Sequence, residues 1–200
     1  MLKAAKVATL FLVIATLLSL AFQVVVIPTP SMEGAVLVGD HLLIDRFAYG
    51  PEIPWTHLRL PRLKRPERGD VVSFHPPGHN DDVYLKRVIA IGGDHVEWRE
   101  GLVFVNGQRR VDLCERSTSQ DQQDIEVPIG QIYLLGDNRN HSEDSRSWGT
   151  VPETNVVGEP VMVLWSIASP TRRWLTSQSS VYLDHPIAHL RWQRLFQRIQ

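Results

Sequence analysis

The sequence is poor in cysteine, with Cys114 as the only copy among 200 residues. A single cysteine cannot form an intramolecular disulfide, so the fold must be stabilised by a hydrophobic core. An excess of one charge is also missing, because 21 Lys and Arg residues nearly balance 22 Asp and Glu residues. This balance excludes a strongly basic nucleic-acid-binding protein, and together with 43% hydrophobic residues it excludes an intrinsically disordered chain. We therefore expect no nucleic-acid partner.

Lysine is scarce as well. Lys3 and Lys6 lie at the N-terminus, and only Lys64 and Lys86 follow in the remaining 194 residues. Lys64 lies among arginines and prolines in a polar stretch, where we expect its side chain to be solvated. Residues 59–68 carry five basic side chains, which predicts an exposed basic loop or, alternatively, a surface that contacts anionic lipid headgroups.

Charge is absent altogether from residues 7–27, a run of 21 residues. As a helix this run would be about 31 Å long, which matches the hydrocarbon thickness of a bilayer. The lysines before it favour a cytoplasmic N-terminus, residues 1–6, and an exported domain, residues 28–200. A cleaved signal peptide ending at Ser19-Leu20-Ala21 is the alternative. Because the apolar run continues to residue 27, we predict one N-terminal transmembrane helix.

Beyond residue 27 the sequence alternates short β-rich runs with turns. Asn106-Gly107 is the strongest hairpin signal among them. No amphipathic helix is expected in the middle of the chain. Residues 191–199 have the spacing of a short amphipathic basic helix, packed on the domain or lying at the membrane surface. We predict a mainly β fold with antiparallel sheets, whose strands include residues 70–74, 83–91, 95–98, 102–105, 132–135 and 156–167.

Ser31 is the first candidate for chemistry, because it lies four residues beyond the apolar run in a backbone stiffened by Pro28 and Pro30. A serine nucleophile needs a base, and lysine serves as one when desolvation lowers its pKa. Lys86 lies within the apolar residues 83–91. Since neighbouring residues of a strand face opposite sides, either Lys86 or Arg87 must face apolar surface. A strand lysine that extends to solvent is the alternative.

A second candidate region is the polar stretch of residues 136–149, rich in Asn, Asp, Ser and Gly. Such residues predict a loop whose side chains hydrogen bond to its own backbone. Asp144 and Arg146 are expected to form an ion pair within it. A solvated turn is the alternative.

These clusters, in this order after an apolar run, resemble the bacterial type I signal peptidases, the serine–lysine enzymes that remove signal peptides. The resemblance covers most of residues 24–168. Gly34 and Ala35 stand where that family usually has proline and threonine, and His141 stands where asparagine is common. The Gly34-Ala35 change affects the loop after the serine. The matching motifs are Ser31-Met32 with Gly39-Asp40, Arg68 to Val72, Tyr84 to Ile89 with Gly93-Asp94, Gly136 to Arg139, Ser142, Asp144 to Arg146, Trp148-Gly149 and Val151-Pro152.

The resemblance implies a serine endopeptidase that cleaves after small residues, Ala-x-Ala, through an acyl-enzyme. Lys86 would be the general base for Ser31, and the Ser31 N–H and the Thr29 hydroxyl would hold the oxyanion. Neither a metal nor a cofactor is implied. The resemblance further implies that Ser142 orients Lys86, that Asp144 and Arg146 support the loop, and that Met32, Tyr84 and Leu85 line the substrate pockets.

The resemblance also implies a cellular setting. The protein would be a monomer in the bacterial cytoplasmic (inner) membrane, with one span and its catalytic domain on the outer face. Its partners would be signal-peptide-bearing preproteins and membrane lipid.

Other functions remain open at this point. A different serine–lysine protease of the same fold, such as a self-cleaving repressor, would not need the apolar run or residues 136–149. A Ser–His–Asp hydrolase is disfavoured because no Gly-x-Ser-x-Gly surrounds Ser31. A non-catalytic anchored β module would not need both Ser31 and Lys86. His75 and His79 could suggest a metal site, but no third ligand accompanies them.

Overall fold

The computed structural model describes residues 2–53, 56, 58–78, 82–110, 124–168 and 190–199. A helix leads into a β domain, and all pairings between its strands are antiparallel, as predicted. The elements are α1 (Leu2–Ala21), β1 (Phe22–Val26), β2 (Asp40–Asp45), β3 (Val71–Phe74), β4 (Tyr84–Ile91), β5 (His95–Arg99), β6 (Leu102–Val105), β7 (Gln108–Arg109), β8 (Asp124–Glu126), β9 (Gln131–Leu135), α2 (Ser145–Trp148), β10 (Val151–Pro152) and β11 (Val156–Ser166).

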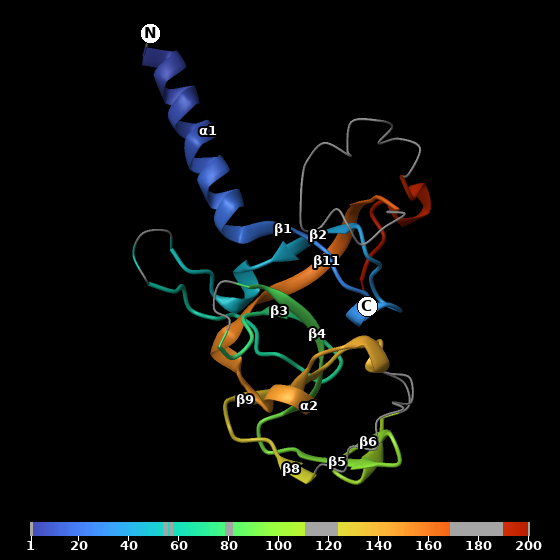
Figure 1. Cartoon of the computed structure of the whole chain (residues 1–200). Helices are drawn as coiled ribbons and strands as arrows, with labels where there is room; N and C mark the ends of the chain where they lie inside the picture. Colours follow the sequence, from blue (N-terminus) through green and yellow to red (C-terminus); the bar gives the residue numbers. More distant parts are fainter. Residues whose placement is uncertain are drawn as a thin grey trace.

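Helix α1 projects away from the β domain (Figure 1). It ends at Ala21, whereas the apolar helix predicted from the sequence continues to Ile27. The difference arises because residues 22–26 form β1, which pairs with β2, and because the Arg46 N–H donates to the Ala21 carbonyl. Within the described part of the chain, no helix combines the length and the apolar character needed to cross a membrane. Six α1 side chains are at least 55% exposed: Val7, Leu10, Phe11, Leu12, Leu17 and Leu18.

The strands form two sheets. Seven strands lie in the order β1-β2-β11-β3-β4-β9-β10, and four lie in the order β7-β6-β5-β8. The smaller sheet lies at the end of the molecule opposite α1 (Figure 1). All six strands predicted from the sequence are present, with ends shifted by at most one residue. Asn106 and Gly107 have φ values of 52° and 75°, which fits the predicted hairpin turn between β6 and β7.

The structure also contains elements that the sequence did not predict. Strands β2, β7, β8 and β10 are additional, and α2 is a four-residue helix in the middle of the chain. Residues 191–199 do not form the predicted helix. They make one 3₁₀ turn, Trp192–Arg194, and then run beside β11, because the Phe196 N–H donates to the Val163 carbonyl and the Val163 N–H to the Gln197 carbonyl.

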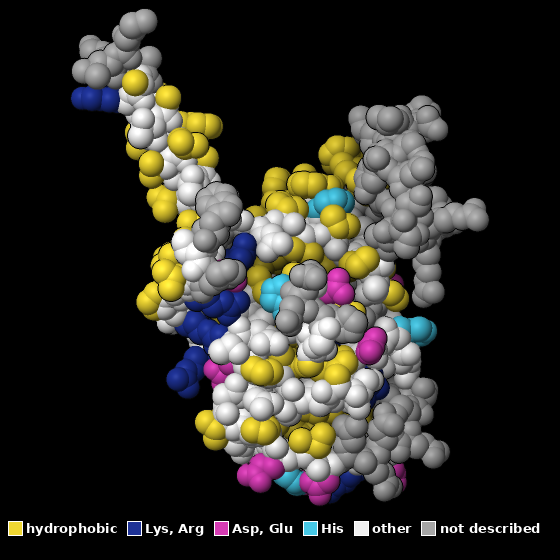
Figure 2. Space-filling model, turned by 60° about the vertical axis from the view of Figure 1, so that its left-hand side comes forward, with side chains coloured by type: hydrophobic (Ala, Val, Ile, Leu, Met, Phe, Trp, Pro, Cys, Tyr) yellow, Lys and Arg dark blue, Asp and Glu magenta, His cyan; other side chains and the backbone are white. Residues whose placement is uncertain are grey.

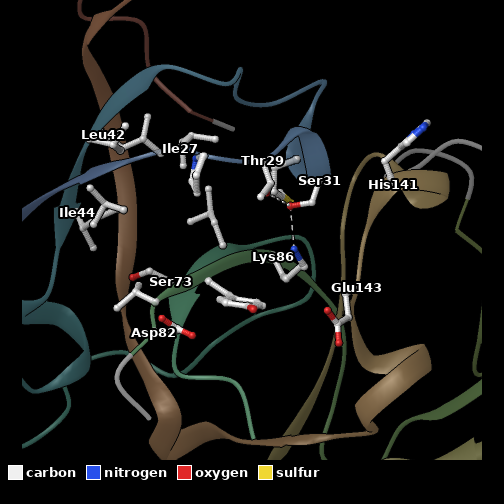
Figure 3. A pocket seen from close by; sticks show the side chains of 17 residues that line it. Ile27, Thr29, Ser31, Leu42, Ile44, Ser73, Asp82, Lys86, His141 and Glu143 are labelled. Carbon is white, nitrogen blue, oxygen red and sulfur yellow. Dashed lines mark hydrogen bonds between the residues drawn. The ribbon is translucent and has the colours of Figure 1, made fainter. Parts of the chain in front are cut away.

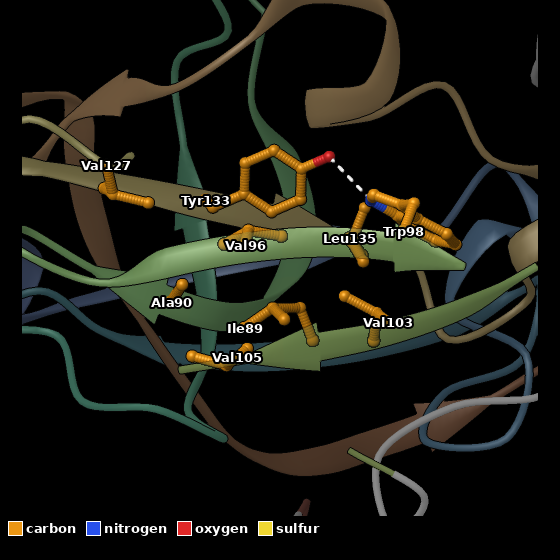
Figure 4. Close-up of a cluster of buried hydrophobic side chains, with 9 residues drawn as sticks. All are labelled: Ile89, Ala90, Val96, Trp98, Val103, Val105, Val127, Tyr133 and Leu135. Carbon is orange, nitrogen blue, oxygen red and sulfur yellow. Dashed lines mark hydrogen bonds between the residues drawn. The ribbon is translucent and has the colours of Figure 1, made fainter. Parts of the chain in front are cut away.

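Buried apolar side chains hold the sheets together. One cluster packs the smaller sheet onto β4 and β9, and within it the Trp98 indole N–H donates to the Tyr133 hydroxyl at 3.2 Å (Figure 4). Another cluster includes Met32, which is 1% exposed and directly follows Ser31. Burying this side chain removes its apolar surface from water, so the backbone beside the serine is anchored in the core. The members of this cluster are Ile27, Met32, Val36, Leu42, Ile44, Val71 and Val163.

Candidate active site

Ser31 lies in a short 3₁₀ turn, Pro30–Met32, between β1 and β2. The turn forms because Pro30 supplies a helical φ at its start and the Glu33 N–H donates back to the Pro30 carbonyl at 3.0 Å. On the other side, the Ser31 carbonyl accepts a hydrogen bond from the Asn138 N–H at 3.1 Å. The serine is therefore held from two directions and is only 8% exposed.

Lys86 meets Ser31 from the middle of β4. Its Nζ lies 2.9 Å from Ser31 Oγ, within hydrogen-bond distance (Figure 3). Thr29 also contacts the serine, with its Oγ1 3.2 Å from Ser31 Oγ. The structure thus brings Thr29, Ser31 and Lys86 together, although 55 positions separate the serine from the lysine.

The Lys86 ammonium is in an unfavourable environment, since the residue is 3% exposed. Burial lowers the pKa of Lys86 from 10.5 to about 8, because a charged amine loses its hydration there. The Asp144, Glu143 and Asp137 carboxylates raise this pKa and the Arg146 guanidinium lowers it, so these charges act in part against the burial. The result is an amine that can become neutral near physiological pH.

The neighbouring cations lie in different settings. Arg87 is also buried. Both Lys86 and Arg87 therefore lie in the interior, whereas the sequence analysis required only one of them to face apolar surface. However, Arg87 forms two 2.8 Å hydrogen bonds to the Asp137 carboxylate, so its charge is compensated. Lys64 is not the fully solvated side chain expected from the sequence, because it is half-buried and contacts Glu159 at 2.7 Å and Asp70 at 3.2 Å.

Residues 136–149 form a loop held by its own side chains, as predicted. Arg146 donates to both oxygens of Asp144, at 2.8 and 2.9 Å, which is the expected ion pair. Asp144 is fully buried and also accepts from the Gly136 N–H, and its side chain caps the start of α2. Arg146 further donates to the Arg139 carbonyl at 2.6 Å. These contacts fix the loop that lies beside Lys86.

Ser142 does not make the hydrogen bond to Lys86 that its expected role requires. Its Oγ is buried and has no hydrogen-bond partner among the described residues. It is packed against Gly136, where an added Cβ would lie 2.2 Å from Ser142 Oγ and 2.5 Å from the Ser31 carbonyl oxygen. A side chain at position 136 would therefore displace both serines, which explains why glycine stands there.

A cavity of about 490 Å³ opens beside the serine (Figure 3). Met32, Tyr84 and Leu85, which were predicted to bind substrate, all line it, and apolar side chains of β1 and β2 form another part of its wall. Sequence reasoning missed several lining residues. Leu42 and Ile44 lie two positions apart in β2, so the alternation of side chains along a strand could have indicated both. The other missed residues lie within or close to the motifs that the sequence analysis identified. The missed residues include Ile27, Leu42, Ile44, Ser73, Asp82, His141 and Glu143.

Of the two histidines that suggested a metal site, only His75 lies within the described residues. His75 Nδ1 lies 2.8 Å from the Asp82 carbonyl, while His79 and Cys114 lie outside the described residues. Within the described ranges, no group of three or more His, Cys, Asp or Glu side chains could hold a metal ion.

Comparison with known proteins finds a signal peptidase family model and relatives that are named as signal peptidases. The family model described as "Signal peptidase, peptidase S26" matches residues 1–165. A probable signal peptidase I-2 of Synechocystis is 33% identical and covers 70% of this chain, while the match spans 62% of that relative, which is under two thirds of its length. The signal peptidase I of Leptolyngbya laminosa is 35% identical, covering 70% of this chain and 68% of that protein. The signal peptidase I of Pseudomonas aeruginosa is 30% identical, covering 80% and 70%.

Proposed function

Because this chain belongs to the signal peptidase family, peptidase S26, we propose that it is a serine endopeptidase that removes N-terminal signal peptides from preproteins. The observation that carries the proposal is the 2.9 Å contact between Lys86 Nζ and Ser31 Oγ in a buried site. A hydroxyl becomes a strong nucleophile only when a neighbouring base accepts its proton, and a desolvated amine near a pKa of 8 can do so.

In the proposed reaction, neutral Lys86 accepts the proton of the Ser31 hydroxyl as Oγ attacks the scissile carbonyl. The charged lysine then donates this proton to the leaving amine, and an acyl-enzyme remains on Ser31. Lys86, neutral again, activates a water molecule that hydrolyses the ester. No metal or cofactor takes part. The charge that develops on the carbonyl oxygen needs nearby donors, for which we propose the Thr29 hydroxyl and the Ser31 N–H.

Other residues support these steps. We assign Asp144 and Arg146 to holding the loop beside Lys86, which is consistent with their buried ion pair. Ser142 is assigned to orienting the Lys86 amine during the reaction, because its buried hydroxyl is packed beside Ser31 and lacks a partner in the described structure. The walls at Met32, Tyr84 and Leu85 would accept the small side chains before the cleavage site.

The proposal includes anchoring to the bacterial cytoplasmic membrane. It is supported by the exposed apolar side chains of α1, a helix that carries Lys6 near its start. A group of Lys and Arg side chains lies beneath the other end of the helix (Figure 2). Basic side chains also lie close together within residues 59–65, where the pKa of Arg62 is lowered by burial and by the nearby Arg59 and Arg65. Apolar surface flanked by basic residues suits a lipid bilayer with anionic headgroups. The proposed topology is a single span with a cytoplasmic N-terminus, residues 1–6, an anchor within residues 7–27 and a monomeric catalytic domain, residues 28–200, on the outer face.

The function is tested by incubating the full chain, in detergent, with a model precursor whose signal peptide ends in Ala-x-Ala. The wild type should cleave it, whereas Ser31→Ala and Lys86→Ala should each lose on the order of a thousandfold or more in kcat. Ser147→Ala, which removes an exposed hydroxyl in α2, is the matched control and should cleave normally. A wild type without cleavage contradicts the function, and a Lys86→Ala variant that still cleaves contradicts the dyad.

A further inference from the structure

The C-terminal segment, residues 190–199, lies against the loop that follows the serine. Its backbone pairs with β11: the Arg191 N–H donates to the Ser166 carbonyl, and the Phe196 N–H donates to the Val163 carbonyl. Its Ile199 packs against the core cluster that contains Met32 and Val36. We call residues 32–40, which connect the serine to β2, the nucleophile loop. The C-terminal segment therefore contacts both β11 and the core cluster to which Met32 and Val36 of this loop belong.

Arg194 joins the two segments through a buried carboxylate. Its Nε lies 3.1 Å from each oxygen of Asp40, and its Nη2 lies 2.7 Å from Asp40 Oδ2. Asp40 is fully buried and the Arg194 side chain is 16% exposed, so salt screens this pair less than an exposed one. The planar guanidinium of arginine binds a carboxylate through two atoms at once and thus fixes its orientation.

Arginine side chains of the C-terminal segment also hydrogen bond to backbone carbonyls of the nucleophile loop. Arg194 Nη2 reaches the Ala35 carbonyl at 3.4 Å, and Arg191 Nη1 donates to the Val38 carbonyl at 2.9 Å. Asp40 itself accepts a hydrogen bond from the Leu37 N–H at 2.8 Å. The two arginines therefore hold the loop at several points along its length.

The nucleophile loop needs such support because its own backbone is permissive. Gly34 has a φ of 120°, where glycine alone is unstrained and where proline, with φ fixed near about −65°, cannot go. The N–H groups of Ala35 and Val36 donate to the Met32 carbonyl, so a displacement of this loop would reach the residue next to Ser31.

We propose that Arg194, through its pair with Asp40, is a positioning residue that holds the nucleophile loop and thereby keeps Ser31 within reach of Lys86. This inference rests on the proposed peptidase function. It assigns the C-terminal segment a role in the reaction, although Arg194 touches neither reacting atom. A small displacement of a nucleophile lowers the rate of the chemical step more than it lowers substrate affinity.

The test compares Arg194→Gln with Arg198→Gln, a matched control in the same segment whose side chain is exposed. Precursor cleavage by the full chain in detergent should show a kcat at least about tenfold lower for Arg194→Gln, with KM changed by less than about twofold. Arg198→Gln should match the wild type. Arg194→Lys should recover part of the lost kcat, since lysine keeps the charge but not the two-atom geometry.

Arg194→Gln removes the closer of the two arginines paired with buried Asp40 and leaves only Arg191, whose Nη1 lies 3.8 Å from Asp40 Oδ1, so this variant could fail by unfolding. The double variant Asp40→Asn, Arg194→Gln removes both charges and should stay folded by circular dichroism while its kcat remains low. The inference is overturned if the folded double variant, or folded Arg194→Gln, cleaves at the wild-type kcat. A wild type that does not cleave overturns the proposed function as well, so the two failures are distinguishable.

Discussion

At the residue scale, the proposed chemistry depends on the surroundings of one lysine side chain. Lys64 and Lys86 carry the same side chain, yet Lys64 contacts two carboxylates and Lys86 contacts the Ser31 hydroxyl. An ion pair stabilises the charged form of an amine, whereas burial beside a neutral hydroxyl destabilises it. For this reason Lys86 is suited to accept a proton and Lys64 is not.

The pH dependence of cleavage should follow the Lys86 amine. A protonated lysine cannot accept a proton, so kcat/KM should rise about tenfold per unit below a pH of about 8 and level off above it. Glu143→Gln should move this rise to lower pH, because the Glu143 carboxylate raises the pKa of Lys86. Stopped assays of precursor cleavage across pH, with Glu126→Gln in the distant β8 as control, measure both. A rise centred near pH 10 would contradict the buried base, and a rise unmoved by Glu143→Gln would contradict the carboxylate's role.

At the element scale, the polar loop of residues 136–149 is rigid because its charges are used internally. Asp144 accepts from Arg146 and from the Gly136 N–H, and it caps α2. The sequence indicated the loop and its ion pair, because Asn, Asp, Ser and Gly compete with regular structure through local hydrogen bonds. The short helix α2 was not indicated, since four residues are too few for an apolar periodicity.

Breaking this ion pair should destabilise the fold strongly. Arg146→Met leaves a fully buried Asp144 carboxylate without its main partner, which should lower the free energy of unfolding by about 3–5 kcal/mol. Arg99→Met removes an exposed pair with Glu97 and should cost less than about 1 kcal/mol. Urea denaturation followed by tryptophan fluorescence measures both values. Equal losses of unfolding free energy in the two variants would contradict the larger contribution that we expect from the buried Asp144 pair.

At the scale of the whole molecule, a short stretch of chain connects the apolar helix to the proposed catalytic site. Helix α1 leads directly into β1, β1 leads to Ser31, and residues of β1 line the cavity beside it. Under the proposed membrane anchoring, a substrate at the base of α1 would therefore be close to the serine. The smaller sheet lies at the opposite end and contributes packing, not lining residues (Figure 1).

Membrane binding should depend on α1 and not on other exposed apolar residues. Leu12→Lys places a charge in the middle of the helix, which should weaken insertion by about 3 kcal/mol and move protein from the pellet to the supernatant when membranes are sedimented. Ile129→Lys changes an 85% exposed side chain in the β domain and should leave the distribution unchanged. If Leu12→Lys sediments like the wild type, α1 is not the anchor. Cleavage in detergent should be normal for both variants.

The sequence by itself determined the features that depend on neighbouring residues. The strands at residues 84–91 and 102–105, the Asn106-Gly107 turn and the candidate pair Ser31 and Lys86 follow from local periodicity, turn chemistry and matching motifs. Only the tertiary structure decided which groups meet across the chain. The end of α1 at Ala21 depends on pairing with β2, and the extended course of the C-terminal segment depends on β11. Arg194 and Asp40 are 154 positions apart, and no local pattern encodes such a contact, because it forms only when the sheet is assembled.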